Sequence, residues 1–93
     1  MATVSVIIPC FNSSSRIQAC VQSVLDQTYA ISEILVYNDG STDNTEMVLR
    51  ELEFSNKLIK AWSGEQTRGA GYARGFLLKK ASSDFVAFLD CDD

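Results

Sequence analysis

The segment VSVIIP, residues 4–9, decides the fold class of this chain of 93 residues. Its apolar, mostly β-branched side chains are interrupted by a single Ser, which is typical of a strand buried on both faces, and Pro9 closes the run. Strands of this kind occur in parallel sheets that carry helices on both sides. We therefore expect residues 4–9 to form an inner strand, and helices to alternate with strands along the chain.

Helix and strand patterns alternate after this segment. Ser13–Ser15 offer N-caps to a helix whose apolar side chains recur every three or four residues. A short strand over Ile34–Tyr37 follows, then a turn over Asn38–Ser41 and a second helix that Thr42 or Asp43 caps. The apolar stripe of the first helix consists of Ile17, Cys20, Val21, Val24 and Leu25.

The second half of the chain continues this order. We predict a weaker third strand over Leu58–Trp62, a third helix over RGAGYARGFLLKKA at residues 68–81, and a fourth buried strand over FVAFL at residues 85–89. The βαβαβαβ order indicates an α/β fold with a doubly wound, Rossmann-like parallel sheet. We expect the strand order 3-2-1-4, with the chain ending after the fourth strand.

Three polar strand ends meet if the strand order is 3-2-1-4. Ligands of doubly wound sheets bind at the carboxyl ends of the strands, where the strand order reverses. Strands one and four are neighbours at that point, so Pro9–Asn12 should lie beside Asp90–Asp93, with Asp39 and Gly40 next to them. We therefore expect the functional site in this crevice.

The charge balance and the cysteines argue against several classes of function. A net charge of −4 without a Lys/Arg cluster argues against a nucleic-acid partner and against an anionic membrane surface. Three cysteines without CxxC spacing argue against a disulfide framework and for a reducing compartment. No apolar run approaches the ~20 residues of a membrane span, and the start does not resemble a signal peptide. We expect a cytoplasmic chain without a membrane span.

The run Asp90, Cys91, Asp92, Asp93 carries the clearest chemical signal. Two carboxylates in an Asp-x-Asp spacing directly after a strand repel each other, and a divalent cation relieves that repulsion. Hard oxygen ligands suit Mg²⁺ or Mn²⁺, with a phosphate completing the coordination shell. Asp90 and Asp92 are therefore the candidate metal ligands. The alternative is a solvated acidic segment that binds nothing.

Asp39 and Phe11 are candidates for holding a nucleotide. A carboxylate at Asp39 can accept hydrogen bonds from a base or a ribose, and a half-exposed ring at Phe11 can stack on a base. Each residue also has a simpler interpretation. Asp39 belongs to an Asn-Asp-Gly-Ser turn of the kind that leads into any capped helix. Phe11 would, in its simpler interpretation, cover the edge of the sheet.

Glycines and arginines lie at the start of the third predicted helix. Gly69, Gly71 and Gly75 form GxGxxxG after the third strand, whereas the dinucleotide fingerprint is GxGxxG after the first strand, so we reject a dinucleotide site. Arg68 and Arg74 lie where guanidinium groups and helix amides could approach a diphosphate. The alternative for Gly71 and Gly75 is close packing of the helix on the sheet.

Together these motifs resemble the amino-terminal half of the family 2 glycosyltransferases, which have a GT-A fold. The resemblance covers almost the whole chain, and the order and spacing of its short motifs are specific. The segment RGAGYARG is most similar to animal proteins described as β-1,3-N-acetylglucosaminyltransferase-like. The matching segments, in chain order, are VSVIIPCFN, SVLDQT, EILVYNDGSTDNT, RGAGYARG and FVAFLDCDD.

The resemblance implies a site for a nucleotide-sugar donor, usually a UDP-sugar, and transfer of the sugar to an acceptor hydroxyl with inversion. It implies that Asp39 binds the base and that Arg74 helps to hold the nucleotide. It also implies that Asp90 binds the ribose or the metal, and that Asp92 ligates the Mn²⁺ or Mg²⁺ that bridges the donor diphosphate and stabilises it as a leaving group. The full set of implied donor-site residues is Pro9, Phe11, Asn12, Asp39, Gly40, Arg68, Arg74, Asp90 and Asp92.

The resemblance further implies that residues 1–93 are only the nucleotide-sugar-binding half of the domain. The acceptor site and the general base belong to the second half in this family, so we expect no catalytic base in this chain and no turnover by the chain alone. One alternative is a non-catalytic nucleotide-sugar-binding fragment. Another is a phosphotransferase similar to the haloacid dehalogenases, but their acidic motif normally follows the first strand and LDCDD follows the fourth.

Overall fold

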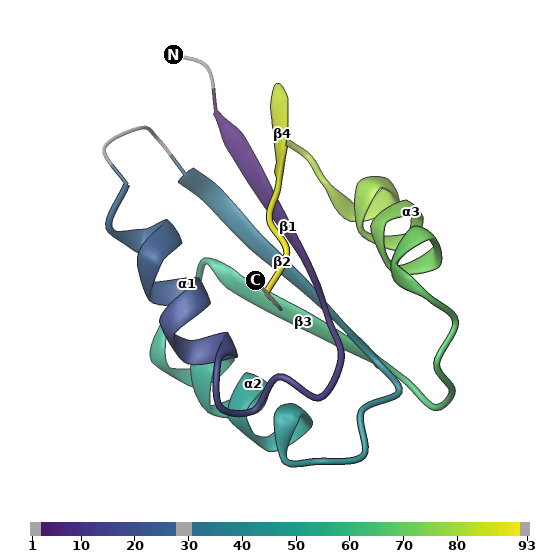
Figure 1. Cartoon of the computed structure of the whole chain (residues 1–93). Helices are drawn as coiled ribbons and strands as arrows, with labels where there is room; N and C mark the ends of the chain where they lie inside the picture. The colour runs from purple at the N-terminus through teal and green to yellow at the C-terminus, as the bar shows by residue number, and fades with distance from the viewer. Residues whose placement is uncertain (1–2, 28–30, 92–93) are drawn as a thin grey trace.

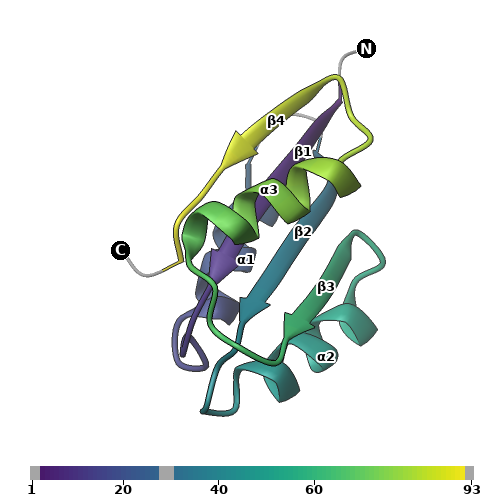
Figure 2. The ribbon, with the colours of Figure 1, turned by 90° about the vertical axis from the view of Figure 1, so that its right-hand side faces the viewer.

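The computed structural model describes residues 3–27 and 31–91, and the strands in these residues form a four-stranded parallel sheet. The strands are β1 (Val4–Cys10), β2 (Ile31–Asp39), β3 (Ile59–Gly64) and β4 (Phe85–Phe88). Their order across the sheet is β3-β2-β1-β4, which Figure 2 shows from the side of the third helix. The predicted order 3-2-1-4 is therefore confirmed, and β1 is the inner strand at which the order reverses.

Three helices connect these strands and cover both faces of the sheet (Figure 1). Helices α1 (Ile17–Leu25) and α2 (Thr45–Ser55) lie on one face, and α3 (Ala70–Lys80) lies on the other. Parallel neighbouring strands need a crossover connection, and each helix provides one. None of the helices in the described residues is long and apolar enough to span a membrane.

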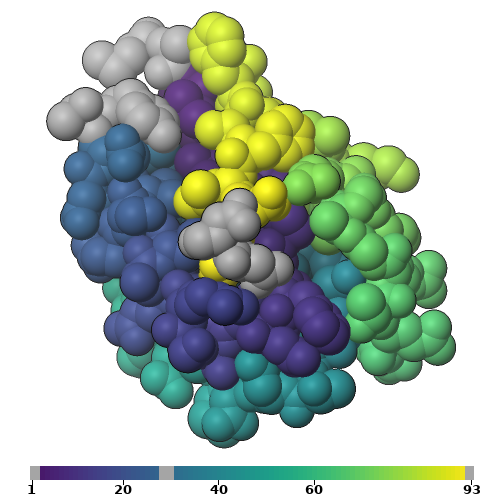
Figure 3. Space-filling model, viewed as in Figure 1, coloured from purple at the N-terminus to yellow at the C-terminus, as the bar shows by residue number. Residues whose placement is uncertain are grey.

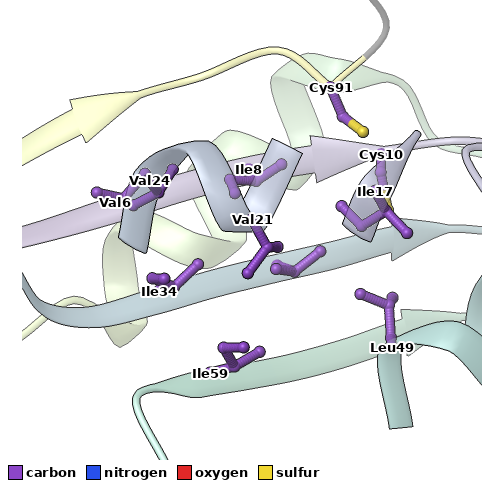
Figure 4. Packing of buried hydrophobic residues seen from close by; sticks show 11 residues of the cluster. Val6, Ile8, Cys10, Ile17, Val21, Val24, Ile34, Leu49, Ile59 and Cys91 are labelled. Carbon is purple, nitrogen blue, oxygen red and sulfur yellow. The ribbon is translucent and has the colours of Figure 1, made fainter. Parts of the chain in front are cut away.

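The larger core lies between the sheet and the two helices α1 and α2. Alternate residues of a strand point to opposite faces, so Val6 and Ile8 of β1 face this core while Ile7 faces the other. Figure 4 shows how α1 side chains such as Val21 pack against strands β1 and β2. The buried members of this cluster are Val6, Ile8, Cys10, Ile17, Val21, Val24, Ile34, Val36, Leu49, Ile59 and Cys91.

The smaller core lies between the sheet and α3. Only two residues of α3, Ala73 and Leu77, are buried, and they pack with Ile7, Leu35 and Tyr37 of the inner strands. Partly buried aromatic rings at the rim extend this cluster. Helix α3 is thus attached to the sheet through a narrow contact, which matters because its first turn also lines a cavity at the carboxyl ends of the strands.

Strand β4 contradicts the prediction that residues 85–89 form a buried strand. Phe85 is 61% exposed and Phe88 is 54% exposed. The reason is the position of β4 at the edge of the sheet, where its ladder partner among the described residues is β1 alone. Figure 3 shows β4, in yellow, at the surface between α1 and α3. An apolar run therefore predicted the strand correctly but not its burial.

The helix starts also differ from the prediction. The N-cap residue of α1 is Arg16 and not one of Ser13–Ser15, and the carbonyl oxygen of Ser13 accepts hydrogen bonds from the Arg16 and Ile17 amides. Asp43 does serve the start of α2, because its Oδ1 accepts a hydrogen bond from the Thr45 amide at 3.0 Å, although Asn44 is the N-cap residue. Hydrogen bonds, foremost that from the Thr45 hydroxyl, lower the pKa of Asp43 to about 2.

Candidate functional site

The predicted strand ends meet around one cavity at the carboxyl edge of the sheet. Its volume is about 220 Å³, and it lies where the order reverses between β1 and β4. This is less than the roughly 300–1,000 Å³ of a complete small-molecule pocket, so it can hold part of a nucleotide-sized ligand. The cavity is lined by Pro9, Cys10, Phe11, Asp39, Thr67, Ala70, Ala73 and Asp90.

Four of the predicted donor-site residues are among this lining, and they come from three strand ends. Pro9 and Phe11 belong to the end of β1 and the loop after it, Asp39 ends β2, and Asp90 follows β4. Phe11 is 40% exposed, as expected for a ring at the mouth of a crevice. The aromatic ring and two carboxylates therefore share one hollow, although 28 to 79 positions separate them along the chain.

Asp39 is nearly buried, with 5% of its surface exposed, and backbone amides hold its carboxylate. The Arg68 amide donates a hydrogen bond to Oδ1 at 2.8 Å, and the Gly69 amide donates one to Oδ2 at 2.9 Å. The Thr67 hydroxyl donates to the Asp39 carbonyl oxygen at 3.1 Å. The end of β2 is thereby tied to the loop that leads into α3.

Gly40 allows this loop to approach β2 closely. A Cβ atom at Gly40 would lie 2.6 Å from the backbone carbon of Gln66 and 2.6 Å from the backbone nitrogen of Thr67. Its φ of 69° is also in the region that favours glycine. Gly40, predicted as a donor-site residue, thus shapes the site through the backbone and is not itself part of the cavity lining.

Asn12 lies next to the cavity but its side chain connects two loops. Its Oδ1 accepts a hydrogen bond from the Thr42 amide at 2.8 Å, and its own amide donates to Ser41 Oγ at 2.9 Å. Asn12 also has a positive φ of 48°, a conformation that Asn tolerates better than most residues. These bonds fix the loop after β1 against the loop after β2, and so fix the place of Phe11.

The two predicted arginines have different surroundings. The Nη2 atom of Arg74 lies 2.9 Å from Oδ1 of Asp90, in an ion pair whose side chains are 39% and 50% exposed. The Arg68 guanidinium lies over the ring of Tyr72, 5.0 Å from its centroid, and it is the Arg68 backbone that contacts Asp39. Arg74 therefore belongs to the immediate surroundings of the acidic strand end, whereas Arg68 reaches the site through its amide.

Asp90 offers the oxygen chemistry that a divalent cation needs. Mg²⁺ in nucleotide sites is usually held by one or two carboxylates together with phosphate oxygens, and the half-exposed Asp90 fits that pattern. Residues 3–27 and 31–91 contain no group of three or more His, Cys, Asp or Glu side chains that could hold an ion by themselves. Asp92, the second predicted ligand, lies outside the described residues.

The sequence indicated the start of α3 through Arg68 and Arg74, but it did not single out the residues on this side that line the cavity. Thr67, Ala70 and Ala73 give no chemical signal of their own, and only their small size beside an arginine pattern hints at a ligand surface. The packing explanation for Gly71 and Gly75 is wrong, because a Cβ atom at either position would meet nothing within 4 Å. These glycines therefore do not mark a close contact between helix and sheet.

Comparison with known proteins places the chain in a family. The family described as Glycosyl transferase family 2 matches residues 5–93. The chain is 49% identical over 90 residues to the UDP-Glc:alpha-D-GlcNAc-diphosphoundecaprenol beta-1,3-glucosyltransferase WfgD of Escherichia coli. That match covers 97% of this chain and 35% of WfgD. The chain thus spans about a third of the length of this relative.

Solved structures share the fold. The mannosyltransferase PcManGT from Pyrobaculum calidifontis, in complex with GDP-Man and Mn²⁺, matches with a TM-score of 0.87 and 26% identity over 96% of this chain and 27% of its own. Staphylococcus aureus TarS 1–349, in complex with UDP, matches with a TM-score of 0.85 and 31% identity over 97% of this chain and 27% of its own. The sequence match and the common GT-A architecture show that this chain belongs to glycosyl transferase family 2.

Proposed function

We propose that this chain carries the donor site of a glycosyltransferase that uses a UDP-sugar. The observation that carries the proposal is the cavity at the reversal of strand order, where Phe11, Asp39 and Asp90 share one hollow. An aromatic ring, a carboxylate held by amides and an exposed carboxylate can serve three parts of one ligand. Those parts are a base, its ring N–H group, and a diphosphate with its cation.

Asp39 and Phe11 would bind the base. The two bonds to Asp39 come from backbone amides, and a carboxylate has more acceptor sites than these two bonds use. Uracil presents an N–H donor between two carbonyl groups, which suits such an acceptor. Stacking of a base on the Phe11 ring would contribute about 1–3 kcal/mol.

Asp90 and Asp92 would hold Mn²⁺ or Mg²⁺, and Arg74 would assist with the diphosphate. The bound cation would act as a Lewis acid on the departing diphosphate. Arg74 already forms an ion pair with Asp90. The same guanidinium is therefore close enough to contact a diphosphate that also binds the metal ion held by Asp90. Asp90 also lines a second hollow of about 340 Å³ beside Arg16, the N-cap residue of α1, and this hollow would give the donor room beyond the base.

We further propose that residues 1–93 bind the donor and do not complete the reaction. WfgD is about three times as long as the matched region, and transfer to an acceptor hydroxyl, with inversion, requires a general base within hydrogen-bond reach of that hydroxyl. In our proposal the rest of a longer chain supplies this base and the acceptor site. The similarity to β-1,3-N-acetylglucosaminyltransferase-like proteins stays a prediction.

Calorimetric titration with UDP, with and without Mn²⁺, tests the proposal. We expect UDP to bind more tightly with Mn²⁺, and Asp92→Ala to remove the difference. Asp39→Asn should weaken binding by about 10- to 150-fold, because a hydrogen bond to a charged group contributes about 1.5–3 kcal/mol. Glu51→Gln, which removes a charge from the exposed face of α2, is the matched control and should bind as the wild type does.

The outcomes separate the possibilities. A folded chain that binds neither UDP nor GDP would refute the donor site, and a preference for GDP would refute the assignment of the base. A sugar-donor hydrolysis assay on the same chain checks the expected lack of turnover. Hydrolysis at a rate typical of a complete enzyme would contradict the view that the general base lies outside these residues.

A further inference from the structure

We infer that Gly69 is a positioning residue for the donor site, because its backbone conformation connects Asp39 to the first turn of α3. The inference rests on the proposed function, since Asp39 is the acceptor that the base would meet. Gly69 is not part of the cavity lining, and no side chain at this position is needed for chemistry. Its contribution is conformational.

Both backbone polar groups of Gly69 have specific partners. Its amide donates a hydrogen bond to Oδ2 of Asp39 at 2.9 Å, and its carbonyl oxygen accepts the first helical hydrogen bond of α3, from the Ala73 amide at 3.2 Å. The preceding amide, that of Arg68, holds the other oxygen of Asp39. One peptide segment therefore fixes both carboxylate oxygens and begins the helix that lines the opposite wall of the cavity.

The conformation that makes these bonds possible is open to glycine. Gly69 has φ 97° and ψ 160°, a region that residues with a Cβ atom essentially do not occupy. A residue with negative φ would turn either the amide away from Asp39 or the carbonyl away from Ala73. Space is not the restriction, because a Cβ atom at Gly69 would meet nothing within 4 Å.

The neighbouring segment leaves little freedom to compensate. Gln66 and Thr67 lie against Gly40, where a Cβ atom would approach their backbone to 2.6 Å, and the Thr67 hydroxyl binds the Asp39 carbonyl oxygen. On the helix side, Ala73 is fully buried against the sheet. Because the segments on both sides of Gly69 are fixed, a change of its φ would break or lengthen the hydrogen bonds of Gly69 itself. The Asp39 carboxylate would then lose its orientation.

A pair of mirror-image substitutions separates conformation from size. The 93-residue chain can be assembled by chemical synthesis as the wild type, Gly69→Ala and Gly69→D-Ala, because a D-residue favours positive φ. The two variants add the same methyl group, on opposite sides of the Cα atom, and they favour φ values of opposite sign. Gly75→Ala is the control, since it adds a methyl group to an equally open site within α3 whose φ is not positive.

Two readouts are needed: the dissociation constant for UDP in the presence of Mn²⁺, and the exchange rates of the amide protons at positions 68 and 69. We expect Gly69→Ala to weaken UDP binding by about 5- to 150-fold, the range that corresponds to 1–3 kcal/mol of backbone strain, and to accelerate both exchange rates. Gly69→D-Ala and Gly75→Ala should match the wild type in both. Far-UV circular dichroism establishes that each variant is folded.

Each outcome decides between explanations. UDP binding by Gly69→Ala within twofold of the wild type would overturn the inference, and so would an equal loss in Gly69→D-Ala. If Gly69→Ala does not fold, the D-alanine variant decides: retained affinity supports the requirement for positive φ, and lost affinity overturns it. A folded wild type that does not bind UDP refutes the proposed function and not the role of Gly69. In that case amide exchange is the remaining test, and unchanged exchange in Gly69→Ala overturns the role of Gly69 in holding Asp39.

Discussion

Glu33 should make a pH-dependent contribution to the stability of this fold, which Glu33→Gln removes. Its carboxylate is buried at 5% exposure near the start of β2. Its Oε2 accepts hydrogen bonds from the Ser5 hydroxyl at 2.6 Å, the Ser82 amide at 2.8 Å and the Ser82 hydroxyl at 3.1 Å. One oxygen atom thus connects β1, β2 and the segment between α3 and β4.

The geometry gives the size of the effect. All three bonds use Oε2, so the carbonyl oxygen of Gln can take its place, and the substitution removes the charge while keeping the contacts. A hydrogen bond to a charged group contributes about 1.5–3 kcal/mol and a neutral one about 0.5–1.5 kcal/mol. Because the three bonds share one atom, we expect a total loss of about 2 kcal/mol, of the 5–15 kcal/mol typical of native proteins.

The pKa of Glu33 gives the direction of the pH dependence. Burial alone would raise it, but the hydrogen bonds from Ser5 and Ser82 and the charge of Lys60 outweigh burial, so the pKa is lower than its usual 4.5. A carboxyl group with a lowered pKa in the folded chain stabilises the fold above its unfolded pKa. That stabilisation is lost as the pH falls through the folded pKa. The wild type and Glu33→Gln should therefore differ fully at pH 7, and the difference should shrink as the pH falls below the usual pKa of 4.5.

Urea denaturation at pH 7, 5 and 3.5 measures this difference. Lys60→Met is the comparison variant, because it removes the ion pair between Lys60 Nζ and Glu33 Oε1 at 3.7 Å but none of the three hydrogen bonds to Oε2. Since the Lys60 side chain is 58% exposed, we expect this variant to lose less stability than Glu33→Gln. A free energy of unfolding that is unchanged in Glu33→Gln at pH 7 would refute the reasoning. A loss of the same size at all three pH values would refute the assignment of the effect to the charge.

Three further predictions concern the cavity and the edge of the sheet. Gly40→Ala should lower the free energy of unfolding by more than about 2 kcal/mol, since it adds a backbone clash to a positive φ; a thermal midpoint within 2–3 °C of the wild type would contradict this. Phe11→Ala should weaken UDP binding by about 5- to 150-fold without changing the denaturation midpoint; unchanged affinity would show that no base stacks there. An exposed strand edge such as β4 favours self-association, and Phe88→Lys, which places a charge there, should reduce it at nearly unchanged stability. Sedimentation velocity measures the difference, and equal sedimentation of both proteins would argue against β4 as a contact surface.

The sequence predicted the architecture well because apolar periodicity determines which face of each element is buried. The inner strand at residues 4–9 and the alternation of helices and strands led directly to the observed strand order. Burial of β4 was not predictable in the same way. Phe85 and Phe88 have the composition of a core strand, but their exposure depends on what lies beyond the sheet edge, which a local pattern does not contain.

The candidate site, too, could be predicted only in part from the sequence. Pro9, Asp39 and Asp90 were found because strand ends of a doubly wound sheet must converge, a consequence of topology alone. Their partners were not found, because amides carry no sequence signal: the bonds from positions 68 and 69 to Asp39 span 29 and 30 residues. Asn12, predicted as a donor-site residue, also joins two loops through its side chain, a contact that its sequence position did not indicate.

Helix α3 determines the arrangement of both carboxylates in the cavity. Its leading segment holds Asp39 through two amides, and Arg74, one turn further along, holds Asp90. The helix itself is attached to the sheet through Ala73 and Leu77, both fully buried. A loss of packing at Leu77 would therefore displace partners of Asp39 and Asp90 together, although Leu77 does not line the cavity. In this fold the small core beneath α3 controls the spacing between the group proposed to bind the base and the group proposed to bind the metal, so stability and donor recognition depend on the same contact.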